Sequence, residues 1–373
     1  MKLILVAGAR PNFMKIAPII KEMKRSSNFE VILVHTGQHY DSNMSKVFFT
    51  DLGIPKPDLN LEIGSGSHAW QTAEIMKKFE SVLIEETPDM IMVVGDVNST
   101  IACSLTAAKM GVKIAHVEAG LRSNNWRMPE EINRVLTDRL SDLLFTSCSD
   151  AKENLLSEGI DENRIHFVGN VMRDSLLSNS KKADLSMILD NLGISQGNYT
   201  VLTLHRPSNV DSRDNLESII SILEEAQKHI NIIYPMHPRT KKQFETLGIL
   251  HRIESLPGLR IIDPVGYLDF MKLIKNAKLV LTDSGGIQEE TTVLGVACLT
   301  MRKETERPVT IKEGTNTIVG LDKELIIDCI ENVLNGNYKK GITPDLWDGK
   351  AAERIIQILM KIEADWNTNG MMK

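Results

Sequence analysis

Short apolar runs alternate with longer amphipathic segments along the first half of the chain. Between two such runs, Ile75, Phe79 and Val82 recur at the spacing of one helix face, and Pro88 ends that pattern. Five runs have the length and composition of buried strands, at residues 3–6, 31–34, 90–94, 113–117 and 143–146. The alternation predicts repeated βαβ units, in which helices cover a parallel sheet.

A second series of the same kind follows a polar stretch at residues 171–198. Its runs lie at residues 201–204, 232–234, 259–262, 279–282 and 298–301. At roughly 100 to 200 residues per domain, the 373 residues predict two domains, 1–175 and 176–349. A C-terminal helix over 350–373 completes the chain, and packing back on the first domain is one arrangement for it. The predicted fold class is α/β, with two doubly wound Rossmann-like domains facing a cleft.

Composition excludes several classes of protein. Lys and Arg number 43 against 49 Asp and Glu, so no overall positive charge favours nucleic acid. The four cysteines are far apart and form no CxxC pair, which predicts neither a zinc site nor a disulfide framework. No apolar run is long enough for a signal peptide or a membrane span. We therefore expect a cytoplasmic protein without a membrane segment or a bound metal.

The turn after the first predicted strand is a candidate phosphate site. It runs from Gly8 into a helix and brings Arg10 and Lys15 together, two cations that could hold a diphosphate beside free backbone N–H groups. The turn is not GxGxxG, and HTGQH stands at the end of the second strand in place of a ribose-binding acid. Tightly bound NAD is therefore disfavoured, and no other cofactor is predicted.

Three carboxylates follow adjacent predicted strands. Asp96 ends the third strand, Glu118 the fourth, and Glu130 opens the next helix after Pro129. Each alone fits a helix cap or a surface ion pair, but together they predict an acid/base group. Mutual repulsion and burial are expected to raise the pKa of at least one of them.

The second half carries a candidate nucleotide site. The segment TDSGGIQEE combines a strand, a glycine-rich turn and a helix start, where Ser284, Gly285 and Gly286 can hold phosphate and Glu290 can bind a ribose. His205 and His237 each follow a strand directly. For the charged loop at 302–315, substrate contact and internal ion pairing are both open.

Taken in order, these segments resemble the signatures of the non-hydrolysing UDP-N-acetylglucosamine 2-epimerases. The matching segments are GARPNFMKIAP, HTGQH, GDVNST, HVEAGLR, MPEEINR, HRPSNV, HPRT, DSGGIQEE and MRKETERP. The resemblance implies a glycosyltransferase-B-like fold, with UDP held by the second domain and the sugar facing the first. It also implies inversion at C2 by elimination of UDP to 2-acetamidoglucal and re-addition, for the synthesis of cell-surface polysaccharide precursors.

The resemblance further implies a set of site residues, a UDP-sugar as the bound partner and a homodimer. The implied catalytic residues are Asp96, Glu118, Glu130, His205 and Lys15. The implied substrate-binding residues are Arg10, Arg134, His237, Phe270, Ser284, Gly285, Gly286, Glu290 and Arg307. Which carboxylate takes the C2 proton stays open.

Three departures from the family pattern bear on the substrate. GQHYDSNM stands where many bacterial members have an Arg-Glu pair, GDVNST lacks a Thr after the Asp, and HRPSN has Ser for Glu. The first departure surrounds Gln38 and His39, which the resemblance marks as candidate allosteric positions. The GQHYD form also occurs in relatives that act on UDP-2,3-diacetamido-2,3-dideoxy uronic acids, so a 2-epimerase of that substrate is the alternative.

Proteins with other functions can have the same fold. A glycosyltransferase would use the same nucleotide site but has little need for three acids. A silent nucleotide-sugar sensor would be expected to lack one of these acids, whereas all three are present. A hydrolysing epimerase would release the free sugar and differs in the access of water to the intermediate.

Overall fold

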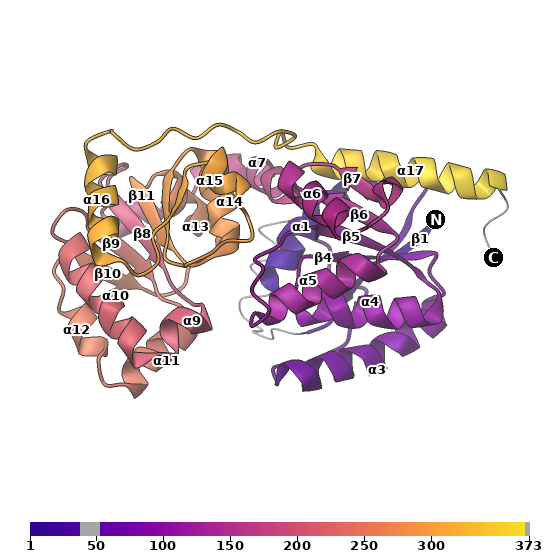
Figure 1. The fold of residues 1–373 in the computed structure, drawn as a ribbon, viewed down its shortest axis with the longest axis horizontal. Coiled ribbons are helices and arrows are strands. Elements are labelled where there is room, and N and C mark those ends of the chain that lie inside the picture. The colour runs from indigo at the N-terminus through magenta and orange to yellow at the C-terminus, as the bar shows by residue number, and fades with distance from the viewer. Residues whose placement is uncertain (38–52, 370–373) are drawn as a thin grey trace. The chain divides into compact units, whose positions relative to one another are not determined.

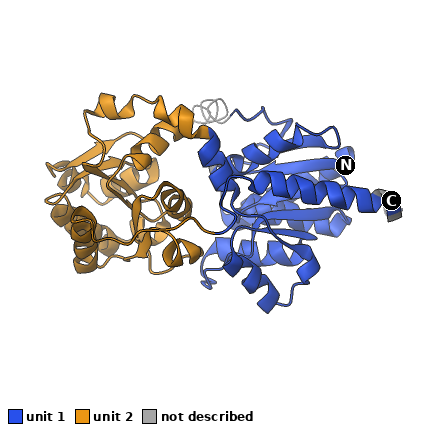
Figure 2. Cartoon of the chain, turned by 90° about the horizontal axis from the view of Figure 1, so that it is seen from above, with its two compact units in different colours: residues 1–178, 345–373 blue, residues 179–344 orange. Residues whose placement is uncertain are grey.

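The computed structural model describes residues 1–37 and 53–369, and contacts between residues divide the chain into two compact units. Unit 1 comprises residues 1–178 and 345–373, and unit 2 comprises residues 179–344, as Figure 2 shows in blue and orange. The chain passes from unit 1 to unit 2 within one helix, α7 (Val171–Asp184), and returns to unit 1 before the last helix.

Unit 1 is built on a parallel sheet of seven strands in the order β3-β2-β1-β4-β5-β6-β7. The strands are β1 (Lys2–Ala7), β2 (Glu30–His35), β3 (Leu59–Asn60), β4 (Met90–Val94), β5 (Lys113–Ala119), β6 (Leu143–Thr146) and β7 (Ile165–Phe167). The central strands are buried along almost their whole length, which is why their sequences are continuous apolar runs.

Helices cover both faces of this sheet (Figure 1). They are α1 (Arg10–Met23), α3 (His68–Glu86), α4 (Asn98–Met110), α5 (Pro129–Leu140), α6 (Ser149–Ser157) and the 3-10 turn η1 (Glu162–Arg164). α3, α4 and α5 pack side by side, and α4 is buried along most of its length by small residues such as Ala102 and Ser104. Pro129 occupies the first turn of α5, where its missing N–H leaves no bond unmade.

The C-terminal helix α17 (Ala351–Asn369) belongs to unit 1 and packs against α1. Its start is fixed by Asp174 of α7, whose carboxylate accepts hydrogen bonds from the N–H groups of Ala351 and Ala352 at 3.3 and 2.7 Å. The buried Trp347 precedes the helix and donates its indole N–H to the Ser147 carbonyl at 2.8 Å.

Unit 2 repeats the architecture with six parallel strands in the order β10-β9-β8-β11-β12-β13. The strands are β8 (Tyr199–Thr203), β9 (Asn231–Pro235), β10 (Leu259–Ile262), β11 (Leu279–Thr282), β12 (Ala297–Thr300) and β13 (Asn316–Ile318). Its helices are α8 (Ile188–Leu192), α9 (Pro207–Val210), α10 (Arg213–Ala226), α11 (Pro238–Thr246), α12 (Leu250–Glu254), α13 (Tyr267–Lys275), α14 (Gly285–Leu294), α15 (Val309–Lys312) and α16 (Lys323–Leu334).

Two doubly wound parallel sheets confirm the predicted fold class. All ten predicted strands are present. Three strands were not predicted, β3, β7 and β13, and each is an edge strand of two or three residues. Among the described helices, none has the length and apolar character needed to cross a membrane.

The cap of α17 predicts a specific pH dependence of stability. Burial raises the pKa of Asp174 to about 6 despite the bonds from Ala352 and Ala351, which lower it. Because the folded pKa lies above the unfolded one, protonation favours the folded state, and this stabilisation is lost as pH rises through about 6. The free energy of unfolding of the wild type, relative to Asp174→Asn, should rise by about 2 kcal/mol as the pH falls from 7 to 4.

Denaturant unfolding of both proteins across that pH range measures this difference. The groups common to both proteins cancel in the comparison. A difference that does not change with pH would show that the pKa of Asp174 is the same in the folded and the unfolded protein.

Candidate active site

Residues predicted to carry chemistry in unit 1 lie at one edge of its sheet. Because all seven strands are parallel, their carboxyl ends meet there, and ligands bind at this edge in open α/β sheets. β4 ends at Val94 beside Val117 of β5, and the Gly95 N–H continues the pairing with the Val117 carbonyl at 3.1 Å. Glu118 is the penultimate residue of β5, and Asp96 comes two residues after the end of β4. The two acids therefore lie at the ends of hydrogen-bonded neighbouring strands.

Glu118 is buried and forms an ion pair with Lys15 of α1. Its backbone is in the left-handed region at φ 73°, and the pairing of β5 with β6 shifts register between Val117 and Ala119. A non-glycine residue in this conformation is strained, and such strain concentrates at functional positions. Gly95 lies against this pair, since a Cβ there would stand 3.0 Å from the Lys15 Nζ and 3.3 Å from the Glu118 carboxylate.

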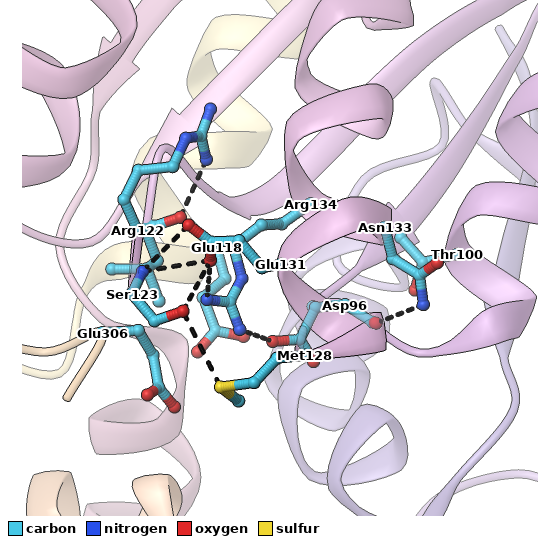
Figure 3. Close-up of polar contacts among 12 residues, drawn as sticks. Asp96, Thr100, Glu118, Arg122, Ser123, Met128, Glu131, Asn133, Arg134 and Glu306 are labelled. Carbon is cyan, nitrogen blue, oxygen red and sulfur yellow. Dashed lines mark hydrogen bonds and ion pairs between the residues drawn. The ribbon is translucent and has the colours of Figure 1, made fainter. Parts of the chain in front are cut away.

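Asp96 is held by helix α5. Arg134 donates from Nη2 to the Asp96 carboxylate at 2.5 Å and from Nη1 to Glu131 at 2.6 Å (Figure 3). The Asn133 side chain donates to the Asp96 carbonyl at 2.9 Å. One face of α5 therefore fixes both the side chain and the backbone of Asp96.

Glu130 lies in the first turn of α5 and is half-buried. The structure thus brings Asp96 and Glu118 to adjacent strand ends and places Glu130 on the helix that contacts Asp96. Each of the first two acids has a cation as a direct partner. The repulsion among three carboxylates that the sequence suggested is therefore offset by Lys15 and Arg134.

A buried charge network beneath this edge was missed by the sequence interpretation. The His116 ring lies between the Gly95 carbonyl, 2.9 Å from Nε2, and the Asp138 carboxylate, 2.7 Å from Nδ1. Asp138 also accepts from the Gly120 N–H and from Arg122, which in turn pairs with Glu158. His116, Asp138 and Arg122 are all buried. The segment HVEAGLR contained two of them, but its spacing gave no sign of their common partner on α5.

Asn12 was also missed, although it shapes the first turn. Its side-chain oxygen accepts from the N–H groups of Gly8 and Ala9, at 3.2 and 2.9 Å, and its amide donates to the Val94 carbonyl at 2.9 Å. Asn12 thereby joins the ends of β1 and β4 and fixes the start of α1. Arg10 begins α1, but its side chain lies outside the described part of the structure, as do Gln38 and His39.

In unit 2 the glycine-rich turn forms the start of α14, as the sequence indicated. Ser284 precedes the helix, and Gly285 and Gly286 open it. Close packing requires glycine at position 285, because a Cβ there would stand 2.5 Å from the Arg307 guanidinium and 2.6 Å from the Glu306 carboxylate. No atom outside the local chain lies within 4 Å of a Cβ built at Gly286, so this side of the turn has room for a ligand. Glu290 lies one turn further on and is buried.

His205 follows β8 and pairs with Asp283, which follows β11. The His205 Nδ1 is 3.0 Å from the Asp283 carboxylate, and the His205 side chain is 40% exposed whereas that of Asp283 is fully buried. Burial by itself would raise the pKa of Asp283, but hydrogen bonds from the His205 ring and from the backbone N–H groups of Arg206 and His205 outweigh it and hold that pKa below its usual range. Asp283 therefore orients His205 with its ring partly exposed.

The remaining predicted residues of unit 2 are His237, Phe270 and Arg307. His237 caps α11 by accepting the Arg239 N–H at 3.2 Å, and its ring centroid is 6.2 Å from that of His205. Phe270 of α13 packs against the core of unit 2. The charged loop contains internal ion pairs, since Arg307 contacts Glu289 and Glu306.

Comparison with known proteins bears on this arrangement. The family model of UDP-N-acetylglucosamine 2-epimerase matches residues 21–360. A "UDP-N-acetylglucosamine 2-epimerase homolog" from Methanococcus maripaludis is 46% identical over 97% of this chain and 100% of its own.

The chain belongs to the UDP-N-acetylglucosamine 2-epimerase family.

Two further members of the UDP-N-acetylglucosamine 2-epimerase family are similar to this chain over nearly its whole length. The crystal structure of the Methanocaldococcus jannaschii UDP-GlcNAc 2-epimerase, in complex with UDP-GlcNAc and UDP, matches with a TM-score of 0.90 and 44% identity over 97% of this chain and all of that one. This match confirms the glycosyltransferase-B-like fold class. A Pseudomonas aeruginosa UDP-2,3-diacetamido-2,3-dideoxy-D-glucuronate 2-epimerase is 41% identical over 97% of this chain and 100% of its own.

The buried network predicts a large effect of Asp138 on the stability of this family member. Asp138→Asn removes the carboxylate shared by His116 and Arg122, so it should lower the free energy of unfolding by about 3 kcal/mol. Urea unfolding followed by tryptophan fluorescence measures this, because Trp70, Trp126, Trp347 and Trp366 all belong to unit 1.

The matched control is Glu162→Gln, which breaks the exposed pair of Glu162 with Lys152. That change should alter stability by less than about 1 kcal/mol. Equal effects of the two variants would contradict the structural importance of the buried network.

Proposed function

We propose that this chain interconverts UDP-N-acetylglucosamine and UDP-N-acetylmannosamine by inverting C2. The observation that carries the proposal is the placement of Asp96 and Glu118 at adjacent strand ends, each beside a cation, on a chain of this family. Carboxylates with fixed, charged neighbours are suited to moving a proton at a defined atom.

The chemistry requires departure of the nucleotide. The C2 proton of a closed sugar ring is not α to a carbonyl, so its removal depends on simultaneous loss of a leaving group from C1. A base takes the proton, the C1–O bond breaks with its electron pair leaving on UDP, and 2-acetamidoglucal forms. Protonation of C2 on the opposite face and re-addition of UDP to C1 complete the reaction. The sequence is redox-neutral and needs no redox cofactor.

In unit 1 the proposed acid/base residues are Asp96, Glu118 and Glu130. The buried pairing of Glu118 with Lys15 supports a role in which the lysine controls the charge of that carboxylate and contributes a cation for the departing diphosphate. Arg10 at the start of α1 is proposed to contact the same phosphates. Arg134 is proposed to act on the substrate through Asp96, which it contacts directly.

In unit 2 the proposed UDP site is the start of α14. The backbone N–H groups of Gly285 and Gly286 and the Ser284 hydroxyl suit a diphosphate, whereas the Ser284 N–H already donates to Thr282. Glu290 suits the ribose hydroxyls. His205 is proposed to face the leaving group, a role supported by its orientation on Asp283 and its exposed ring. His237, Phe270 and Arg307 are proposed as further contacts to the nucleotide.

A second substrate is favoured by one relative. The Pseudomonas aeruginosa enzyme acts on a UDP-2,3-diacetamido uronic acid, and it is 41% identical over nearly the whole chain. The same residues would perform the same inversion at C2 on that sugar. The two proposals differ only in the groups recognised at C3 and C6.

Further proposals concern the oligomeric state, the cellular location and the biological role. A homodimer is supported by exposed apolar side chains on the two helices that flank α4 in unit 1, Trp70 and Ile84 on α3 and Ile132 and Leu136 on α5. A cytoplasmic location and a role in polysaccharide precursor synthesis stay predictions from the sequence resemblance.

The decisive measurement is proton NMR of the purified protein with UDP-N-acetylglucosamine in D2O containing EDTA. Loss of the C2 proton signal together with growth of the UDP-N-acetylmannosamine anomeric signal is expected. Release of free N-acetylmannosamine would indicate a hydrolysing enzyme instead. No reaction with this sugar, but exchange with the diacetamido uronic acid, would assign the second substrate.

Asp96→Asn should reduce the rate of C2 exchange by about 10²- to 10⁴-fold, because the amide cannot move the proton. UDP affinity, measured by calorimetry, should stay close to wild type, since none of the proposed UDP contacts is made by Asp96. The control is Asp142→Asn, which changes an aspartate just before β6, at the opposite edge of the same sheet. Exchange at the wild-type rate in Asp96→Asn would remove Asp96 from the mechanism.

Glu290→Ala should have the opposite pair of effects, weaker UDP binding and retained C2 exchange. Loss of a carboxylate that binds ribose should weaken UDP binding by about 10- to 100-fold, with C2 exchange retained at saturating substrate. Glu324→Ala, on the exposed face of α16, is the matched control and should bind UDP as wild type does. Unchanged UDP affinity in Glu290→Ala would refute the ribose assignment.

A further inference from the structure

Glu131 is a buried carboxylate that the proposed chemistry does not use. It follows Glu130 in the first turn of α5, yet only 1% of its surface is exposed. A buried charge persists only where hydrogen bonds and an opposite charge stabilise it. The partners of Glu131 therefore indicate why a carboxylate is kept there.

One set of partners comes from the loop between β5 and α5. The backbone N–H of Asn124 donates to Glu131 at 2.7 Å, that of Ser123 at 3.0 Å, and the Ser123 hydroxyl also donates at 3.0 Å. Asn124 is held in the left-handed region at φ 58°. Glu131 thereby fixes the loop that connects the strand of Glu118 to the helix of Glu130 (Figure 3).

The other partner is Arg134, one helical turn further along α5. Its guanidinium spans two carboxylates, with Nη1 at 2.6 Å from Glu131 and Nη2 at 2.5 Å from Asp96. Only 3% of the Arg134 side chain is exposed, so the guanidinium has little freedom to turn toward water. The charge of one arginine is thus shared between a buried acid and a proposed catalytic acid.

We infer that Glu131 is a positioning residue, which sets the proton affinity of Asp96 by competing with it for Arg134. The inference rests on the proposed function for its link to catalysis. The charge sharing itself is a property of unit 1 that can be tested without any substrate.

Glu131→Gln separates the two sets of partners. The amide oxygen can still accept the backbone N–H groups of Ser123 and Asn124, which contact Oε1 in the wild type. The amide nitrogen then faces Arg134, to which it cannot act as an acceptor, and the Ser123 hydroxyl, which can rotate to accept from it. Arg134 should therefore interact more strongly with Asp96, and a nearby negative charge is removed.

The test is a pH titration of Asp96 by carbon NMR of protein labelled with ¹³C at the aspartate carboxyl carbon. Asp96→Asn identifies the resonance by its loss. In Glu131→Gln the titration midpoint of Asp96 should fall by about one pH unit relative to wild type. An unchanged midpoint, or a higher one, would overturn the inference.

Two variants distinguish charge sharing from simple loop support. Ser123→Ala removes one hydrogen bond to Glu131 without changing any charge, so the Asp96 midpoint should stay at the wild-type value. Glu131→Asp keeps the charge and should restore the midpoint at least in part. Equal shifts in Ser123→Ala and Glu131→Gln would show that only the loop matters, and Glu131→Asp keeps the test open if the glutamine variant does not fold.

The pH profile of C2 exchange supplies the link to catalysis. The limb of the kcat/KM profile that reports Asp96 should move to lower pH in Glu131→Gln, by the same amount as the NMR midpoint. A shifted midpoint without C2 exchange of either UDP-sugar in the wild type would refute the proposed function while leaving the charge sharing intact. A shifted midpoint with an unmoved rate profile would refute the catalytic link alone.

Discussion

The pairing of opposite charges at the carboxyl ends of β4 and β5 is the constraint on which the rest of unit 1 depends. Glu118 is buried near the end of β5, and Asp96 is partly buried just after β4. An uncompensated carboxylate beside these apolar strands would be destabilising. Lys15 and Arg134 compensate them from two different helices. The start of α1 and the packing angle of α5 are therefore restricted by charge as well as by apolar contacts.

A second set of charged and polar side chains, beginning with His116 and Asp138, fixes the same edge of the sheet. His116 joins the Gly95 carbonyl to Asp138, so the turn carrying Asp96 is attached to α5 through the His116 ring. Asn133 and Arg134 attach the same turn to α5 directly. A proton-transfer group needs a fixed position relative to the reacting atom, and these contacts with one helix provide it.

The sequence predicted the fold well because its strands are buried on both faces. Runs such as 90–94 are apolar throughout, so they stood out from the amphipathic helices around them. The short edge strands β3 and β13 were not predicted, because two or three residues are too few to show a periodic pattern. Asp96, Glu118 and Glu290 were found because each follows a strand or a glycine-rich turn, where parallel topology places ligand-binding residues.

What the sequence could not predict is which charges become partners. Glu131 and Glu130 are adjacent and identical in type, and only the rotation of α5 buries one while leaving the other half-buried. Asp138 is separated from His116 by 22 residues, and Arg134 from Asp96 by 38. Such pairs are determined by how a helix lies on a sheet. A motif can therefore identify the acids of a site from sequence alone, whereas the groups that tune those acids require the packed structure.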